Sequence, residues 1–318
     1  MKVRNADRKT WRHFVEHCPG ATFFHTPEWY ELWATYLRQK VALRLLEWRE
    51  RPPVLLPLLV GRALKGLARA YVSAPVGTYG GCLCTEPLVD QQGEAVARYL
   101  AGFPMLSLCD NPYDSSWSGA LDWTGEDATQ VIDLDVPPEQ QLVRWSSHHR
   151  RALRKAQGFA WELSQAHTEA EWRAYFELYR QSVRRWGTRA SNSYRWPLFV
   201  ELRALPPEHC RLWLAGEGGQ IRAGALCFYL HDRLIYWHGA TAAEALPKNP
   251  GQWLHYQIIR HAWTAGYRCY DLGPSAGLPG VEAFKKGFGA RRLSFGRLEK
   301  QSPTIRFLSQ ISNTFRSS

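Results

Sequence analysis

The stretch that decides the fold reads LPKNPGQ at residues 246–252, GYRCYDLG at residues 266–273 and VEAFKKGFG at residues 281–289. Asn249 is a favourable residue just before a helix, Pro250 suits the first helical position, and Gly251 lets a ligand approach the backbone closely. The spacing predicts a helix from there to Gly266, followed by a short apolar strand at Tyr267–Asp271. A strand, a helix and a second strand in this order form a βαβ unit.

A helix that starts at Pro250 directs unpaired N–H groups and the positive end of its dipole toward whatever lies in front of it. Helix starts of this kind bind phosphate groups. The sequence therefore predicts a site for the phosphates of an activated donor, formed by Asn249, Pro250, Gly251, Gln252 and Trp253. The alternative is purely structural, because capped helices after glycine-rich turns occur throughout α/β proteins.

Residues 139–159 form a second distinctive segment. The spacing predicts one amphipathic helix with apolar side chains on one face and basic side chains on the other. The basic face comprises Arg144, His148, Arg151 and Lys155, and no acidic residue interrupts residues 144–155. Like charges four residues apart repel each other, so this face is costly unless an anion binds it. An anion-binding site and a solvated surface both stay open as interpretations.

Four further sequence motifs accompany these segments: FFHTPEWYELW (residues 23–33), a P-x-x-x-Y-G-G loop (75–81), TQVIDLD (129–135) and SSHHRRALRKA (146–156). Together with the NPGQW helix start, the YDLG strand end and the FKKGFG phrase, they resemble the Fem-type (FemAB-like) branch of the GNAT acyltransferase superfamily. The resemblance covers most of the chain. It implies an α/β (α+β) fold with tandem GNAT-like domains, each a mixed, largely antiparallel central sheet flanked by helices.

Capping and turn signals predict several other elements. A Thr-Pro pair at residues 26–27 opens one helix, and a Thr-x-x-Glu capping box at residues 168–171 opens another. Two apolar runs, Val41–Trp48 and Val54–Val60, are separated by a short polar stretch and predict a hairpin. Three strands between Arg211 and Ala240 predict a meander that leads into the βαβ unit.

Length and composition are those of one large or two medium domains, and we expect two. The chain has 318 residues, of which 45% are apolar, so it can bury a substantial core. The pair Pro137-Pro138 marks the expected boundary. Residues 1–136 are expected to form a degenerate N-terminal GNAT-like domain on the acceptor side. Residues 137–318 are expected to form the C-terminal GNAT-like domain, which binds the donor and carries catalysis.

Acyl transfer to an amine needs a held donor, an amine freed of its extra proton, and help for the developing oxyanion. Asp271 and His238 are the nearest candidate bases, one at each end of the central unit. The alternatives are that Asp271 forms a turn and that His238 is a packed, hydrogen-bonded strand residue. The sequence contains no Ser-His-Asp or Cys-His signature, which favours direct attack over a covalent acyl-enzyme.

The resemblance assigns further site residues. In Fem-like transferases a lysine of the F-K-x-G-F-G phrase is implicated at the active site, which implies a catalytic role for Lys285. Lys286 adjoins it and is expected to contact the donor, and which of the two lysines faces the site stays open. The matching P-x-x-x-Y-G-G loop lies near the acceptor site, which implies acceptor contacts for Tyr79, Gly80 and Gly81. Without the resemblance these three read as an ordinary turn.

Forty basic and twenty-nine acidic side chains leave a net charge of +11, which predicts an anionic partner. The expected donor is acyl-CoA, an acyl carrier protein or aminoacyl-tRNA, and the expected acceptor is an anionic amine on a cell-envelope precursor such as that of peptidoglycan or an exopolysaccharide. We expect no tightly bound cofactor and no metal site. The alternative function is a non-catalytic basic protein that binds polyanions or a membrane surface through residues 144–155.

The cysteines and the hydropathy of the sequence predict the cellular compartment of the protein. Seven cysteines without a disulfide-framework spacing predict a reducing cytoplasm. The sequence opens without a cleavable signal pattern, and no apolar run approaches the roughly 20 residues that span a bilayer. A cytoplasmic protein is expected, with contact at the inner face of the membrane as an open alternative.

Overall fold

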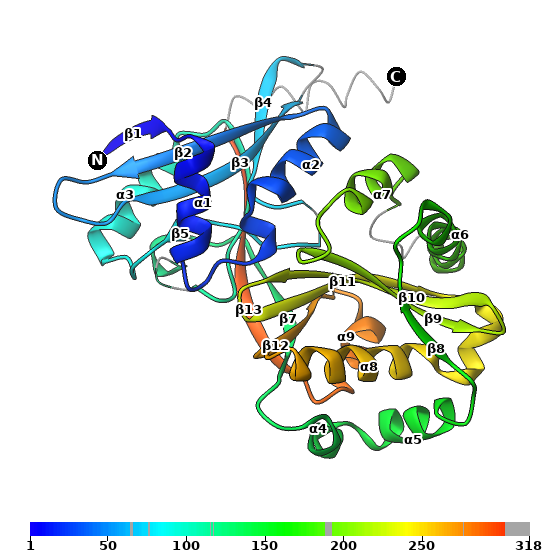
Figure 1. Cartoon of the computed structure of the whole chain (residues 1–318). Coiled ribbons are helices and arrows are strands. Elements are labelled where there is room, and N and C mark those ends of the chain that lie inside the picture. The colour runs from blue at the N-terminus through cyan, green and yellow to red at the C-terminus, as the bar shows by residue number, and fades with distance from the viewer. Residues whose placement is uncertain are drawn as a thin grey trace, which may run out of the picture. The chain divides into compact units, whose positions relative to one another are not determined.

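A computed structural model describes residues 1–63, 66–75, 77–114, 116, 118–187, 193–275 and 277–302 (Figure 1). The chain divides into two compact units, one comprising Met1–Asp127 and the segment from Ser294, the other Ala128–Leu293. The expected boundary at Pro137-Pro138 lies about ten residues after this division. The reason is that β7 (Gly125–Asp133) pairs with β12 (Cys269–Pro274) of the second unit. The segment from Ser294, expected in the second domain, belongs to the first unit.

The first unit is a mixed sheet with helices. Its strands follow the order β1-β2-β3-β4-β6-β13, and β5 pairs with β3. β4 and β6 are parallel, whereas the other pairs are antiparallel. The strands are β1 (Lys2–Asn5), β2 (Lys40–Glu47), β3 (Val54–Ala63), β4 (Ala68–Val72), β5 (Leu83–Cys84), β6 (Met105–Cys109) and β13 (Arg291–Gln301). The helices are α1 (Arg8–His17), η1 (Phe23–His25), α2 (Pro27–Leu37), α3 (Asp90–Ala101) and η3 (Ser118–Ala120).

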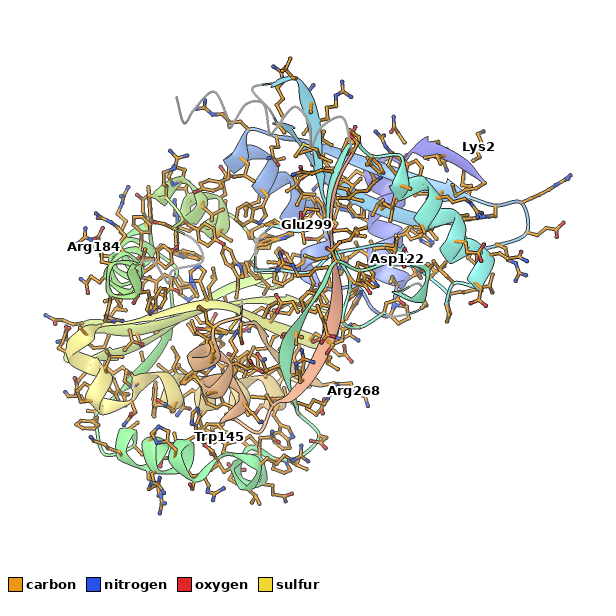
Figure 2. The ribbon with its side chains drawn as sticks, turned by 180° about the vertical axis from the view of Figure 1, so that it is seen from behind. Lys2, Asp122, Trp145, Arg184, Arg268 and Glu299 are labelled. Carbon is orange, nitrogen blue, oxygen red and sulfur yellow. The ribbon has the colours of Figure 1, made fainter. Side chains whose placement is uncertain are left out.

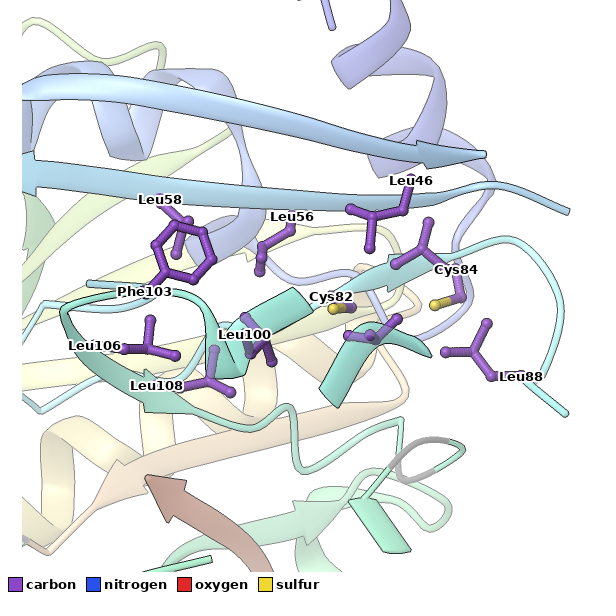
Figure 3. Packing of buried hydrophobic residues seen from close by; sticks show 12 residues of the cluster. Leu46, Leu56, Leu58, Cys82, Cys84, Leu88, Leu100, Phe103, Leu106 and Leu108 are labelled. Carbon is purple, nitrogen blue, oxygen red and sulfur yellow. The ribbon is translucent and has the colours of Figure 1, made fainter. Parts of the chain in front are cut away.

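A core of leucines and cysteines joins β2, β3 and β6 to α3 (Figure 3). Leu56 and Leu58 lie two residues apart on β3, so both point to the same face of the sheet. Val96 and Leu100 lie four residues apart on α3 and present one helical face to that sheet. Two periodicities, of two residues on the strand and of about four on the helix, therefore build one apolar layer.

The second unit has the strand order β7-β12-β11-β10-β9-β8. β11 and β12 are parallel, and the other neighbours are antiparallel. α8 and α9 lie on one face of this sheet, and α6 and α7 lie on the other (Figure 1). The remaining strands are β8 (Glu162–Gln165), β9 (Cys210–Glu217), β10 (Gln220–Leu230) and β11 (Arg233–Thr241). The helices are α4 (Pro138–Arg144), α5 (Ser147–Ala156), α6 (Glu169–Trp186), α7 (Trp196–Arg203), η5 (Ala243–Lys248), α8 (Pro250–Thr264) and α9 (Pro279–Lys286).

The two units share one order of elements. In each, a helix pair precedes three antiparallel strands, β2-β3-β4 in the first and β9-β10-β11 in the second. A helix, α3 or α8, then leads to a parallel strand, β6 or β12. An antiparallel strand completes each sheet, and it comes from elsewhere in the chain: β13 pairs with β6, and β7 pairs with β12. The predicted fold class, with tandem domains of mixed and largely antiparallel sheets, is confirmed.

Most helix starts predicted from capping residues are confirmed. The Thr26 hydroxyl accepts a hydrogen bond from Trp29 N at 3.2 Å, and α2 begins at Pro27. Thr168 and Glu171 form the reciprocal capping box at the start of α6. The β2–β3 hairpin and the β9-β10-β11 meander also form as predicted.

The prediction of one helix over residues 139–159 is wrong. The chain forms α4 and α5 instead, because Trp145 is extended and Ser146 caps a new helix, its hydroxyl accepting from His149 N at 3.2 Å. The Trp145 ring is buried and packs edge-on against Phe288, with ring centroids 4.8 Å apart (Figure 2). Burying this ring favours the break over continuation of a helix whose basic residues repel each other.

Candidate active site

The site lies where two parallel strands of the second unit, β11 and β12, stop pairing with each other. β11 and β12 share three paired positions, Arg233–Cys269, Leu234–Tyr270 and Ile235–Asp271. Both strands continue beyond these pairs, β11 to Thr241 and β12 to Pro274, without further pairing to each other. Gly273 has φ +73°, and a Cβ there would lie 2.8 Å from the Tyr236 carbonyl oxygen. Only glycine permits this approach.

Lys285 is buried beside the end of β12. Lys285 is 4% exposed. Its Nζ donates hydrogen bonds to the carbonyl oxygens of Gly273 at 2.9 Å and Pro274 at 2.8 Å. A buried ammonium group needs such partners, because its desolvation is costly. Lys286 is exposed. Of the two adjoining lysines, Lys285 is the one directed toward the end of β12.

Asp271 is fully buried on β12. Its Oδ1 accepts from Gly273 N at 2.7 Å and also from the Thr129 hydroxyl. A carboxylate that accepts from a backbone N–H two residues later fixes a turn. This turn presents the Gly273 carbonyl to Lys285, so the contacts describe a positioning role. Proton transfer by Asp271 stays a prediction.

His255 on α8 is a site residue that sequence reasoning missed. It is 4% exposed, its Nδ1 lies 2.8 Å from the Tyr270 hydroxyl, and its ring packs edge-on against Tyr236. Burial, with a contribution from the Lys285 ammonium, lowers the pKa of His255 to about 3. The imidazole is therefore neutral at pH 7. Helical spacing to the apolar residue Ile258 was the available signal, since it places residue 255 on the buried face of α8.

The start of α8 has the predicted position and the predicted N-cap residue. Pro250 is the first helical residue, and Asn249 occupies the capping position. Asn249 adopts a left-handed conformation with φ 55°, and its side chain makes no capping hydrogen bond. Asn249 is therefore the N-cap residue as predicted, but its side chain takes no part in the cap. The N–H groups of Gly251 and Gln252 have no acceptor within the helix, as at every helix start.

The side chains at this helix start are largely interior. Gln252 is 9% exposed and Trp253 is 8% exposed, and the Trp253 ring lies 6.4 Å from that of Trp161. Gly251 is half-buried, and a Cβ there would lie 3.9 Å from Phe284 Cζ, an ordinary contact. A ligand at this place would meet the backbone at Gly251 rather than the side chains of its neighbours.

His238 lies on β11 on the face covered by α6 and α7. Its Nδ1 is 2.7 Å from the Tyr175 hydroxyl, and its buried Nε2 has no hydrogen-bond partner among the described residues. Burial lowers the pKa of His238 to about 3. A group with such a pKa is a weak base at neutral pH. Its role in catalysis stays a prediction.

The basic face predicted on residues 144–155 is smaller than expected. Placing Arg144 on this face is wrong, because it lies on α4 and forms two hydrogen bonds with the Asp135 carboxylate, at 2.6 and 3.0 Å. This pair lowers the pKa of Asp135. His148, Arg151 and Lys155 are exposed on α5. Within the part of the chain that the structure describes, no acidic side chain forms an ion pair with these three.

The predicted acceptor loop belongs to the first unit. The Tyr79 side chain is fully buried and packs edge-on against Phe24 and Phe295. A Cβ on Gly80 would lie 2.3 Å from a backbone oxygen, and Gly81 has φ +96°. Both glycines are therefore required by the backbone. Acceptor contacts for residues 79–81 stay a prediction, and the burial of Tyr79 speaks against a contact through its side chain.

α9 fits against α5 through a glycine. A Cβ on Gly287 would lie 2.4 Å from His149 Cε1. His149 is 4% exposed, and its ring centroid lies 5.3 Å from that of Phe284 and 4.5 Å from that of Phe288. Burial lowers the pKa of His149. The His149 ring is therefore packed against Phe284, Gly287 and Phe288, and these contacts help to position the helix that carries Lys285.

We expect Gly287→Ala to lower the free energy of unfolding by about 2 kcal/mol or more, because the added methyl group overpacks a filled core. Gly280→Ala lies on the same helix with no atom within 4 Å of the added methyl group. This control is expected to be neutral or stabilising by up to about 1 kcal/mol. Urea unfolding of both variants measures the difference, and equal effects would contradict the role assigned to His149.

The described residues contain no group of three or more His, Cys, Asp or Glu side chains that could hold a metal ion. Over the same residues, no helix combines the length and the apolar character needed to cross a bilayer. All seven cysteines have free thiols.

Comparisons with known proteins agree with this arrangement. Residues 145–286 match the family model of the acetyltransferase (GNAT) domain. No curated protein sequence matches the chain at a significant level. The structure of FemX is similar, with a TM-score of 0.72 and 13% identity over 96% of this chain and 99% of FemX. Two further structures cover 96% of this chain. They are the C-terminal domain of a putative lysylphosphatidylglycerol synthetase from Agrobacterium fabrum (TM-score 0.55, 14% identity, 95% of that chain) and L-PGS from Bacillus licheniformis (0.52, 12%, 96%).

The chain therefore contains a GNAT acyltransferase domain, and this domain carries Lys285, Asp271 and His238. The chain also has the fold of FemX along nearly its whole length. The resemblance to the Fem-type branch of the GNAT superfamily is confirmed on these two findings, the second of which speaks to the fold alone.

Proposed function

We propose that this protein is an N-acyltransferase that moves an acyl or aminoacyl group from an activated, phosphate-bearing donor to an amine. The observation that carries the proposal is the end of pairing between β11 and β12, where the Lys285 ammonium is bonded to the Gly273 and Pro274 carbonyls. An acyl donor can bind to backbone groups that are not paired within the sheet and to a helix start. A developing oxyanion is stabilised by a fixed cation.

The reaction follows from direct attack. The amine nitrogen forms a bond to the acyl carbon, and the bond from that carbon to the donor sulfur or oxygen breaks. The amine loses one proton, which passes to solvent or to the leaving thiolate or alkoxide. The positive end of the α8 dipole and the N–H group of Gly251 would face the donor phosphates. Acyl-CoA, an acyl carrier protein and aminoacyl-tRNA all meet this description.

The Fem-type fold supports a cell-envelope precursor as the acceptor, such as one for peptidoglycan or an exopolysaccharide. The test is a screen by mass spectrometry, in which the purified protein is incubated with acyl-CoAs or charged tRNAs and a panel of amine acceptors. We expect a product whose mass equals that of the acceptor plus the free carboxylic or amino acid minus one water. Absence of product with every donor would contradict the proposal.

A second candidate function is favoured by α5. Arg151 and Lys155 are exposed without an ion-pair partner among the described residues, which suits a protein that binds polyanions without catalysis. This candidate predicts salt-sensitive binding of nucleic acid or anionic vesicles, no product in the screen, and no effect of substitutions at Lys285.

We expect the double variant Arg151→Glu/Lys155→Glu to weaken binding of the anionic donor by about tenfold or more, because four units of charge change beside it. The fold should stay intact, since both side chains are exposed. Arg184→Glu/Arg268→Glu makes the same change in charge at exposed positions elsewhere in the second unit (Figure 2). If the two double variants bind the donor with equal affinity, α5 does not contribute to the donor site.

A further inference from the structure

Two neighbouring rings of β11 face the same side of the sheet. Tyr236 pairs with Cys227 and His238 pairs with Leu226, so Trp237 is an extra residue in a β-bulge. As a result the Trp237 and His238 rings both contact side chains of α6 or of the segment before α7. The strand therefore directs two consecutive aromatic side chains to one place.

Tyr175 on α6 contacts both the ring and the backbone of His238. Its hydroxyl oxygen lies 2.7 Å from His238 Nδ1 and 3.2 Å from the His238 carbonyl oxygen. We assign the hydroxyl proton to the carbonyl, which can only accept, and in this tautomer Nδ1 carries a proton that it donates to Tyr175. Nε2 is then a bare acceptor, buried and without a partner among the described residues. Gly224 makes room for this arrangement, because a Cβ there would lie 2.5 Å from the Tyr175 ring.

Aromatic rings surround the imidazole. The distances between ring centroids and His238 are 5.2 Å for Tyr179, 6.3 Å for Tyr194, 5.7 Å for Phe199 and 4.6 Å for Trp237. The faces of such rings carry negative potential, and so does the lone pair on Nε2. The imidazole adds no positive charge at pH 7, because burial keeps its pKa at about 3. This combination attracts a cationic N–H donor and disfavours a carboxylate or phosphate.

An unpartnered acceptor in the interior destabilises the protein, and an N–H group of a ligand would supply the missing hydrogen bond. Tyr194, Trp237 and His238 are half-buried, so the cluster reaches the surface of the second unit. His238 follows the last residue of β11 that pairs with β12, Ile235, on the same strand. The cluster therefore lies on the part of β11 just beyond its last pair with β12.

We propose that His238 Nε2 and the rings of Tyr179, Tyr194 and Trp237 form the subsite for the acceptor amine, a primary amine on an alkyl chain. This inference rests on the proposed function and names the group that the acceptor presents. His238 binds and orients the amine nitrogen without storing its proton. Tyr175 is a positioning residue that acts through His238.

The test is a titration of the full-length protein, labelled with ¹³C-histidine, with n-butylamine and with n-butanol at pH 7.5. n-Butylamine carries a positive charge at this pH, whereas n-butanol has the same chain length without charge. We expect n-butylamine to shift the His238 resonance saturably, and n-butanol to bind at least about fivefold more weakly. The resonance is identified by its loss in His238→Phe. Equal binding of the alcohol, or no shift with the amine, would overturn the subsite.

Trp237→Leu is expected to weaken n-butylamine binding by about fivefold or more. The matched control is Trp263→Leu on α8, where the tryptophan is 41% exposed. This control should leave the affinity unchanged. If Trp237→Leu does not fold, Tyr194→Leu at a half-buried position provides the same measurement. Equal losses in the control and in either cluster variant would contradict the proposal.

The subsite and the proposed function fail separately. Product formation in the donor screen, with n-butylamine affinity unaffected by Trp237→Leu, would overturn the subsite and leave the acyltransferase. Binding of n-butylamine at His238 without product from any donor would support an amine site and overturn the transferase.

Discussion

Lys285→Met is expected to lower kcat/KM for acyl transfer by about 10²- to 10³-fold, the loss typical of removing one fixed group that stabilises a developing oxyanion. Lys285 is buried with its ammonium against the end of β12, whereas Lys286 is exposed. Lys286→Met is therefore the matched control, and we expect it to change kcat/KM by less than about threefold. Steady-state kinetics with the donor and acceptor found in the screen measures both variants.

Stability must be measured on the same preparations. Lys285→Met leaves the carbonyl groups of Gly273 and Pro274 without this donor, so the free energy of unfolding should fall by about 2–3 kcal/mol. Circular dichroism and urea unfolding identify the conditions in which the variant is folded, and kinetics is compared there. Equal activity of the two lysine variants when both are folded would contradict the assignment of Lys285 to the active site.

The free energy of unfolding should fall steeply as the pH drops below about 6. His238 and His255 have folded-state pKa values of about 3, against 6.5 for an ordinary histidine. Between these values the unfolded chain binds a proton that the folded chain excludes, so stability decreases with decreasing pH. Each histidine contributes about 1.4 kcal/mol for each pH unit, and from pH 6 to pH 4 the two together contribute on the order of 5 kcal/mol.

Urea unfolding between pH 8 and pH 4 tests this dependence. In the double variant His255→Leu/Tyr270→Phe both partners of the buried hydrogen bond are removed, so no polar group of that pair is left unsatisfied. We expect it to reduce the slope of stability against pH by about 1.4 kcal/mol per pH unit below pH 6. His13→Leu, at an exposed position, is the control and should keep the original slope. The same slope in both variants would show that His255 is not the buried titrating group.

Helices were predictable where their starts carry a chemical signature. The Thr-Pro pair before α2 and the capping box before α6 specify their positions locally, and the glycine at residue 266 ends α8 in the left-handed conformation, φ +82°. The helix α9 was not predicted, because it has only eight residues and no side-chain hydrogen bond caps its start. Its position depends on contacts between Gly287 and His149, which are far apart in the sequence.

The break between α4 and α5 could not be read from periodicity. Apolar and basic residues continue at helical spacing through Trp145 and Ser146, but burial of the Trp145 ring against Phe288 overrides the local pattern. The sequence also could not predict that a strand from elsewhere in the chain completes each sheet. The pairing of β13 with β6 joins residues nearly two hundred positions apart, such as Arg297 and Cys109.

The site was predicted in part. The sequence indicated the start of α8 and the lysine of the FKKGFG phrase, because both belong to short motifs. It did not indicate the hydrogen bonds of His255 with Tyr270 or of His238 with Tyr175, since each joins residues of separate elements. Histidines without a motif around them give no signal of burial beyond their helical or strand spacing.

The central claim is that the start of α8 holds the phosphates of the acyl donor. The most direct measurement is the ¹⁵N–¹H signal of Gly251 in glycine-labelled protein, titrated with whichever donor yields product. Gly251→Ala identifies the signal, because the added methyl group makes only an ordinary contact with Phe284 at 3.9 Å. We predict a saturable shift that inorganic pyrophosphate reverses by competition. A donor that yields product while the Gly251 signal stays in place would contradict the claim.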